Sequence, residues 1–140
     1  MATKLYPPQL EGALPAFYKT YDTNGKLKGL TLTIPFGINR TVSYSSISNI
    51  ALRLRTTSTN TYLIADKKAV QMDLDNGKAV FKFDYDETDE DTDKTASLIN
   101  EGQYYRVQLA FIDIDGTIGY YSTVGIIKCV AKPTVYIDNY

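Results

Sequence analysis

The 140-residue sequence contains no histidine, no tryptophan and a single cysteine. Without histidine, the chain cannot use an imidazole as a general base, as a zinc or copper ligand, or as a switch near neutral pH. One cysteine, Cys129, cannot form a disulfide within the chain, and its apolar neighbours indicate a buried, inert thiol. No Gly-x-Gly-x-x-Gly, P-loop or Gly-x-Ser-x-Gly motif is present. These absences predict a protein that is not an enzyme and needs no cofactor.

Long apolar runs are also missing, since no segment approaches the roughly 20 residues that span a bilayer. Met1–Pro8 has neither a basic start nor a long apolar stretch, so we expect a protein made in the cytoplasm and not held by a membrane. The 15 Lys and Arg nearly balance the 16 Asp and Glu, which leaves no basic excess for nucleic-acid binding. Tyrosine is abundant, with 12 residues, and its large apolar ring with a polar tip suits half-exposed strands and protein contacts.

The near-zero net charge of the whole chain conceals one strongly acidic stretch, Asp84–Asp93. Seven of its ten residues are acidic and none is basic, so the rest of the chain carries a formal net charge of +6. Seven neighbouring carboxylates repel each other unless solvent, a cation or a basic partner screens them. The stretch is therefore a candidate calcium site, a candidate docking surface for a basic neighbour, or a solvated loop.

Calcium is the most specific of these three interpretations. Asp89, Asp91 and Asp93 have the every-second-residue spacing that begins an EF-hand loop. Lys94 then stands where that loop needs glycine, and Asn100 stands where a bidentate glutamate is expected. The three aspartates are thus a weak calcium candidate, and no metal is predicted with them.

Apolar and polar residues alternate with a period of two along most of the chain, which predicts β-strands. We expect strands at Leu30–Ile34, Ile47–Thr56, Tyr62–Ala65 (as an edge strand), Ala69–Leu74, Lys78–Tyr85, Gln103–Ile114 and Tyr120–Ala131. Asn76-Gly77 separates two alternating runs and predicts a hairpin, because this pair tolerates the positive φ of a tight turn. The only helix expected is one turn within Thr95–Asn100. The strand lengths and the turn spacing predict an all-β, antiparallel sandwich.

Such a sandwich needs about 100 residues, which leaves material at both ends. We expect an extended N-terminal arm and a first strand in residues 1–26, the sandwich in 27–133 and an extended tail in 134–140. Pro7, Pro8 and Pro15 favour an extended arm over a helix. The tail alternates apolar and polar residues without a partner strand, so we expect it either to add a strand to the sheet of another subunit or to be the first strand of a further unit.

The segment Gly102-Gln-Tyr-Tyr-Arg-Val-Gln-Leu-Ala, followed by Asp115-Gly116, Tyr121-Ser122 and Lys132-Pro133, resembles the last two strands of fibronectin type III-like domains. The resemblance covers roughly residues 27–133 and implies an immunoglobulin-like sandwich. It also implies that a tyrosine near the start of the penultimate strand bonds back to the preceding corner, and Tyr105 or Tyr104 would take that place. The core tryptophan common on the family's second strand is absent here, so the resemblance concerns topology.

A second resemblance concerns Leu5-Tyr-Pro-Pro-Gln-Leu-Glu-Gly-Ala-Leu-Pro-Ala-Phe17 and Leu32-Thr-Ile-Pro-Phe-Gly-Ile-Asn39. Together they resemble the start of virion structural proteins of tailed bacteriophages, often found before immunoglobulin-like modules. The resemblance implies a structural component of a virion, in the tail, neck or fibre region, made in the host cytoplasm. Its implied partners are other virion proteins and further copies of the same chain in a homo-oligomer, with neither nucleic acid nor membrane.

Candidate interface residues follow from the two extended ends and from the tyrosines. They are Leu5, Tyr6, Leu10 and Phe17 in the arm, Tyr104, Tyr120 and Tyr121 in the last two strands, and Val135, Tyr136 and Ile137 in the tail. We expect Tyr104, Tyr105, Tyr120 and Tyr121 to cluster on one sheet face, either as simple cross-strand packing or as a sugar or protein platform.

The alternative function is a carbohydrate or host-surface binding module. It would use Tyr104, Tyr120 and Tyr121, with or without calcium at the acidic stretch. Arg53 and Arg55 point outward from their strand and are expected to be ordinary solvent charges, or contacts for the acidic stretch of a neighbouring copy.

Overall fold

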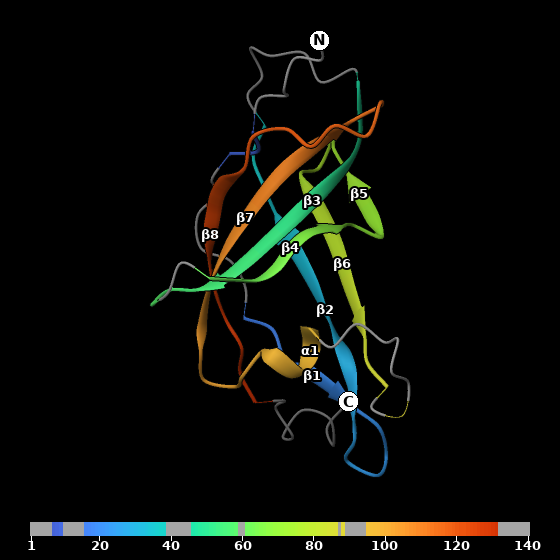
Figure 1. The fold of residues 1–140 in the computed structure, drawn as a ribbon, viewed down its shortest axis with the longest axis vertical. Coiled ribbons are helices and arrows are strands. Elements are labelled where there is room, and N and C mark those ends of the chain that lie inside the picture. Colours follow the sequence, from blue (N-terminus) through green and yellow to red (C-terminus); the bar gives the residue numbers. More distant parts are fainter. Residues whose placement is uncertain are drawn as a thin grey trace.

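The fold is that of a computed structural model, which describes residues 7–9, 16–38, 46–58, 61–86, 88 and 95–131 (Figure 1). Eight strands and one short helix lie in these ranges. They are β1 (Lys19–Tyr21), β2 (Leu27–Pro35), β3 (Ile47–Thr56), β4 (Tyr62–Lys68), β5 (Gln71–Asp73), β6 (Lys78–Asp84), α1 (Thr95–Leu98), β7 (Tyr104–Asp113) and β8 (Ser122–Lys128). No helix within the described ranges has the length and apolar character needed to cross a membrane.

The strands form two four-stranded sheets that pack face to face. One sheet has the order β1-β2-β6-β5 and the other has the order β4-β3-β7-β8. Every strand pairing within them is antiparallel. The prediction of an all-β, antiparallel sandwich is therefore confirmed, and β4 lies at a sheet edge as expected.

Local sequence signals account for most of the elements. The Asn76-Gly77 hairpin is confirmed, since β5 and β6 pair on either side of it and Gly77 has a φ of 65°. A Cβ at Gly77 would also overlap the carbonyl oxygen of Phe36, so only glycine fits this turn. The helical turn is confirmed as α1, whereas β8 is shorter at both ends than the predicted Tyr120–Ala131.

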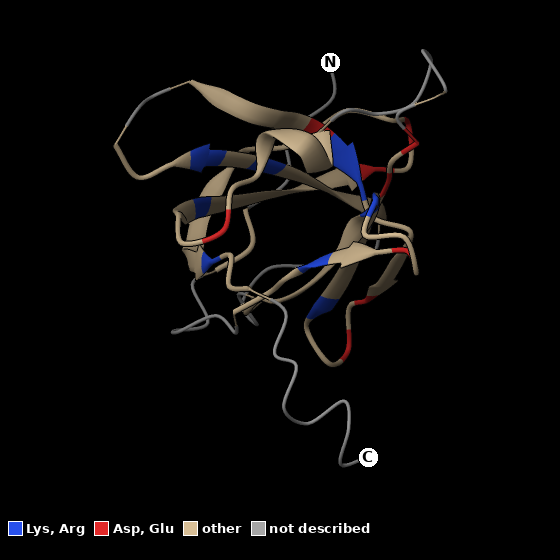
Figure 2. Cartoon of the chain, turned by 90° about the horizontal axis from the view of Figure 1, so that it is seen from below, with Lys and Arg blue, Asp and Glu red and all other residues tan. Residues whose placement is uncertain are grey.

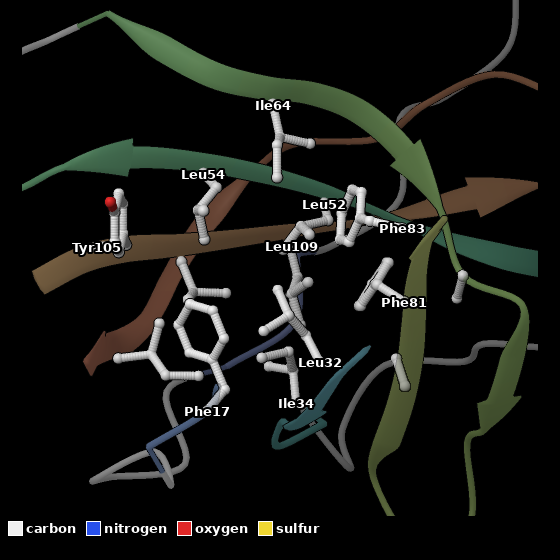
Figure 3. Packing of buried hydrophobic residues seen from close by; sticks show 14 of the residues in the cluster. Phe17, Leu32, Ile34, Leu52, Leu54, Ile64, Phe81, Phe83, Tyr105 and Leu109 are labelled. Atoms are coloured by element: carbon white, nitrogen blue, oxygen red, sulfur yellow. The ribbon is translucent and has the colours of Figure 1, made fainter. Parts of the chain in front are cut away.

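The core lies between the two sheets and is built from the inward-facing residues of both (Figure 3). One sheet contributes Leu32, Ile34, Phe81 and Phe83, and the other contributes Leu52, Leu54, Ile64, Tyr105 and Leu109. Fully burying one such aliphatic or Phe side chain stabilises the fold by ~1.5–3 kcal/mol relative to leaving it in water. The apolar residues of the period-two pattern in the sequence are thus the ones buried between the sheets.

Tyr105 closes the core next to α1. Its side chain is fully buried, and its hydroxyl oxygen accepts a 2.7 Å hydrogen bond from the backbone N–H of Asn100. Tyr104, the neighbouring residue, is 52% exposed. The predicted bond back to the preceding corner is therefore present, and Tyr105 makes it. Burial raises the pKa of this phenol above its ordinary value.

The N-terminal segment joins the sandwich earlier than the predicted start at residue 27. β1 pairs with β2, and Phe17 forms a parallel bridge with Cys129. In that bridge the Phe17 N–H donates to the Lys128 carbonyl oxygen at 3.1 Å, and the Phe17 carbonyl oxygen accepts from the Val130 N–H at 2.8 Å. Further upstream, Gln9 and Gly37 exchange two backbone hydrogen bonds. The strand expected within residues 1–26 is therefore an integral part of the sandwich.

Candidate functional site

The outer face of the β4-β3-β7-β8 sheet carries several side chains that contact one another. Alternation along β3 turns Leu52 and Leu54 into the core and places Arg53 and Arg55 on this outer face. Antiparallel pairing sets Arg53 opposite Gln108 and Arg55 opposite Arg106. Three arginines from two neighbouring strands therefore share one sheet face.

Arg53 lies between two aromatic rings. Its guanidinium carbon is 4.0 Å from the ring centroid of Tyr121 and 4.8 Å from that of Tyr62, which are cation–π distances. One of its terminal nitrogens also donates a long, 3.5 Å hydrogen bond to the Tyr62 hydroxyl oxygen. These contacts hold the guanidinium group in one place on the sheet.

Asp66, on the edge strand β4, completes this group. The Tyr121 hydroxyl donates a 2.6 Å hydrogen bond to one Asp66 carboxylate oxygen. Burial, followed by the hydrogen bond and the negative charge of Asp66, raises the pKa of Tyr121 well above its ordinary value, so the phenol stays neutral and remains a donor. We refer to Arg53, Tyr62, Asp66 and Tyr121 as the Arg53 site.

Asp66 also has a φ of 57°, in the left-handed region that residues other than glycine rarely adopt. The β3–β4 pairing is irregular nearby, with register shifts on either side of Leu54. An irregular, charged edge strand resists pairing with another sheet. The same irregularity places the Asp66 carboxylate beside Tyr121.

A surface hollow of about 400 Å³ adjoins the Arg53 site. Its lining consists of Arg53, Asp66, Ile118, Gly119, Tyr120 and Tyr121. Tyr120 is 59% exposed at this position. The hollow thus combines a fixed guanidinium group, a carboxylate and an exposed ring.

A second group of side chains lies near the start of β7 on the same outer face. Tyr104 lies opposite Lys128, and Arg106 lies opposite Ile126. The Lys128 ammonium group is 5.3 Å from the centre of the Tyr104 ring, and both Tyr104 and Ile126 are about half exposed. We refer to these four residues as the Tyr104 patch.

Two polar atoms on this face are buried without a hydrogen-bond partner among the described residues. They are Nε of Arg106 and Oε1 of Gln108. The Gln108 side-chain nitrogen donates a 3.4 Å hydrogen bond to the Thr123 hydroxyl on β8. Buried polar atoms without a partner cost free energy, so these two atoms do not stabilise the sheet.

The predicted cluster of four tyrosines is wrong. In the β7–β8 hairpin, Tyr104 lies opposite Lys128, whereas Tyr121 directly precedes Ser122, which lies opposite Leu109. Tyr104 and Tyr121 therefore lie near opposite ends of the hairpin. Tyr105 faces the core because neighbouring residues of a strand point to opposite sides.

Phe17 is a second correction among the interface residues. It was expected to contact another subunit, but it is only 6% exposed and packs in the core of its own chain, with its ring centre 6.5 Å from that of Tyr105. Six other predicted interface residues lie outside the described residues: Leu5, Tyr6, Leu10, Val135, Tyr136 and Ile137.

The calcium candidates Asp89, Asp91 and Asp93 also lie outside the described residues. Within the described part of the chain, no group of three or more potential metal-ligating side chains comes together. Cys129 is fully buried, as expected, and burial raises the pKa of its thiol.

The Arg53 site was not predicted from the sequence. Arg53 was identified only as an outward charge, and its contact with Tyr121 depends on strand pairing over a long stretch of chain. Asp66 and Tyr121 are 55 positions apart, and no local pattern connects them.

Comparison with protein-family models, with curated proteins and with solved structures found no match to this chain.

Proposed function

We propose that the chain is a structural, non-enzymatic component of a bacteriophage particle, in the tail, neck or fibre region. It would assemble through protein–protein contacts with other virion proteins and with further copies of itself. The virion setting is suggested by the sequence likeness of Leu5–Phe17 and Leu32–Asn39. Assembly by surface contact is suggested by the Tyr104 patch.

The Tyr104 patch is the observation that carries this proposal. Tyr104 and Ile126 are 52% and 45% exposed on a sheet face, next to Arg106. Aromatic residues and arginine are enriched where proteins bind each other, and large exposed apolar side chains gain most when a partner covers them. A rigid sheet beneath the patch lowers the entropic cost of binding.

The strand order supports the proposed immunoglobulin-like character of the sandwich. In constant-type immunoglobulin domains one sheet has the order A-B-E-D and the other contains C, F and G. We label β1, β2 and β3 as A, B and C, and β5, β6, β7 and β8 as D, E, F and G. The first sheet then has the order A-B-E-D. In the second sheet C, F and G lie side by side, with β4 at the edge next to C. The hydrogen bond between Tyr105 and Asn100 fits the tyrosine corner of such domains.

The charge distribution supports contact between copies. Most described Lys and Arg residues lie on strands, whereas most described Asp and Glu residues lie in turns and at strand ends (Figure 2). The acidic stretch Asp84–Asp93 begins at the end of β6, and Arg53, Arg55 and Arg106 lie on the other sheet. Opposite charges on different surfaces of one chain favour oriented association.

Analytical ultracentrifugation of the full chain tests the assembly proposal. We expect concentration-dependent association that weakens as sodium chloride is raised, because salt screens exposed charges. The double variant Tyr104→Ser with Ile126→Ser should lose association, while Val70→Ser should keep it, since Val70 is 63% exposed on the other sheet's side of the chain. A wild-type chain that stays monomeric at millimolar concentration would contradict the proposal.

The second candidate function is carbohydrate or host-surface binding. The structure separates Tyr104 from Tyr121, so these residues do not form one platform. The observation that favours this function is instead the hollow beside Tyr120 and the Arg53 site.

A further inference from the structure

We propose that the hollow formed by Arg53, Asp66, Tyr120 and Tyr121 binds one unit of a neutral saccharide that carries adjacent hydroxyl groups. The inference rests on the second candidate function and does not depend on the assembly proposal. The volume of the hollow, about 400 Å³, falls within the range of about 300–1,000 Å³ typical of small-molecule sites.

Asp66 supplies the acceptors. An ionised carboxylate has about four lone-pair positions on its two oxygens, and the hydrogen bond from Tyr121 occupies one of them. The side chain of Asp66 is exposed and lines the hollow. It can therefore accept hydrogen bonds from two neighbouring sugar hydroxyls while keeping its bond to Tyr121.

Arg53 supplies the donors. A guanidinium group carries five N–H donors in a fixed plane, and the hydrogen bond to Tyr62 uses one of them. Because the rings of Tyr62 and Tyr121 already hold this group, little side-chain freedom is lost when a ligand binds. The donor plane and the Asp66 carboxylate lie around the same Tyr121 ring, so one ligand can reach both.

The paired charges of Arg53 and Asp66 favour a neutral ligand. Arg53 attracts an acidic sugar while Asp66 repels it, and the reverse holds for a cationic ligand, so a charged ligand gains little net attraction here to offset the cost of its desolvation. A neutral polyol instead uses each charge as one half of a charge-assisted hydrogen bond. The exposed ring of Tyr120 provides an apolar surface at the same hollow, on which the C–H face of a sugar ring can pack.

The test titrates the full chain with a panel of methyl glycosides of neutral hexoses and measures binding by two-dimensional NMR. We expect saturable shifts at Arg53, Asp66 and Tyr121 for at least one member of the panel, with millimolar affinity. Methyl glucuronide, an acidic probe, should bind at least ten-fold more weakly than the matching glucoside.

Asp66→Asn and Arg53→Lys are the informative variants. Asn also tolerates the left-handed backbone at position 66, so the fold should be retained, as a urea unfolding curve will verify. We expect each variant to weaken binding at least ten-fold, and the turn variant Asp115→Asn to leave it unchanged.

Three results would overturn the saccharide proposal. The first is that no member of the panel binds at 50 mM, a concentration about ten-fold above a typical weak Kd of a few millimolar. The second is that wild type and Asp66→Asn bind the sugar equally well. The third is that the chain prefers the glucuronide to the glucoside. Self-association is measured separately. A chain that binds no saccharide would therefore not contradict the assembly proposal, and a chain that does not self-associate would not contradict the saccharide proposal.

Discussion

The two faces of the β4-β3-β7-β8 sheet are built from alternate residues of the same strands, but they depend on different interactions. On the inner face, Leu52 and Leu109 lie opposite each other and are fully buried. On the outer face, the neighbouring pair is Arg53 and Gln108, and each side chain has specific polar or ring partners. The inner face stabilises the fold through buried area, whereas outer-face side chains such as Arg53 and Gln108 stay partly exposed and make polar and ring contacts.

The largest effect that tests this comparison is expected from Leu109→Ala. Removing a fully buried leucine loses its transfer free energy and leaves a cavity, which should lower the free energy of unfolding by about 2–5 kcal/mol. Urea denaturation of the purified chain measures this change. Ile126→Ala on the outer face is the matched control, with an expected loss of less than about 1 kcal/mol. Equal losses at the two positions would contradict the comparison.

A smaller effect is expected from Tyr105→Phe. The variant loses the hydrogen bond with the Asn100 N–H and should lower the free energy of unfolding by about 1 kcal/mol. Tyr104→Phe is a close control, because the adjacent ring faces solvent and its change should fall within about 0.5 kcal/mol of wild type. Similar curves for the two variants would show that the corner bond does not stabilise the chain.

A third effect is expected only in alkaline solution. Burial raises the pKa of both Tyr105, on the inner face, and Tyr121, on the outer face, above the value of about 10 that a tyrosine has in the unfolded chain. Their stabilising contribution is complete below pH 10 and is lost as the pH rises toward the folded-state pKa values, because only the unfolded chain releases these protons.

Urea unfolding between pH 8 and pH 12 measures this decline. The double variant Tyr105→Phe with Tyr121→Phe should show a shallower decline above pH 10 than wild type. The single variants separate the contribution of each face. An unchanged slope in the double variant would mean that other groups cause the alkaline loss of stability.

The smallest effect is expected from Tyr121→Phe at neutral pH. The ring stays in place over Arg53, and only the hydrogen bond to the exposed Asp66 is lost, so the expected change is below about 1 kcal/mol. The same urea assay measures it. A loss above 2 kcal/mol would show that the Arg53 site supports the fold itself.

The inner face could be predicted from the sequence because burial repeats with the period of the strand. Leu52, Leu54, Val107 and Leu109 all occupy alternating apolar positions, and all are fully buried. The outer face could not be predicted in the same way. Its contacts depend on which strands pair and in which register, and the alternation along a single strand contains neither.

The tyrosines illustrate this limit. Their positions on two strands expected to be neighbours suggested that residues 104, 105, 120 and 121 would cluster, but the register of the hairpin places the first pair far along the sheet from the second. The partners that Tyr121 does have, Arg53 and Asp66, come from β3 and β4. Phe17 was misassigned for a similar reason, since its partner Cys129 is more than a hundred positions away.

The parallel bridge between Phe17 and Cys129 has a mechanical consequence. In a parallel pair, a pull toward the N-terminus on one segment and a pull toward the C-terminus on the other act in opposite directions along the same axis. The two hydrogen bonds of the bridge, from Phe17 to Lys128 and from Val130 to Phe17, would then be loaded together in shear. Tension applied through both ends of the chain would load these bonds, together with the Gln9–Gly37 pair nearer the N-terminus, before it separated the two sheets, so the bridge would resist stretching.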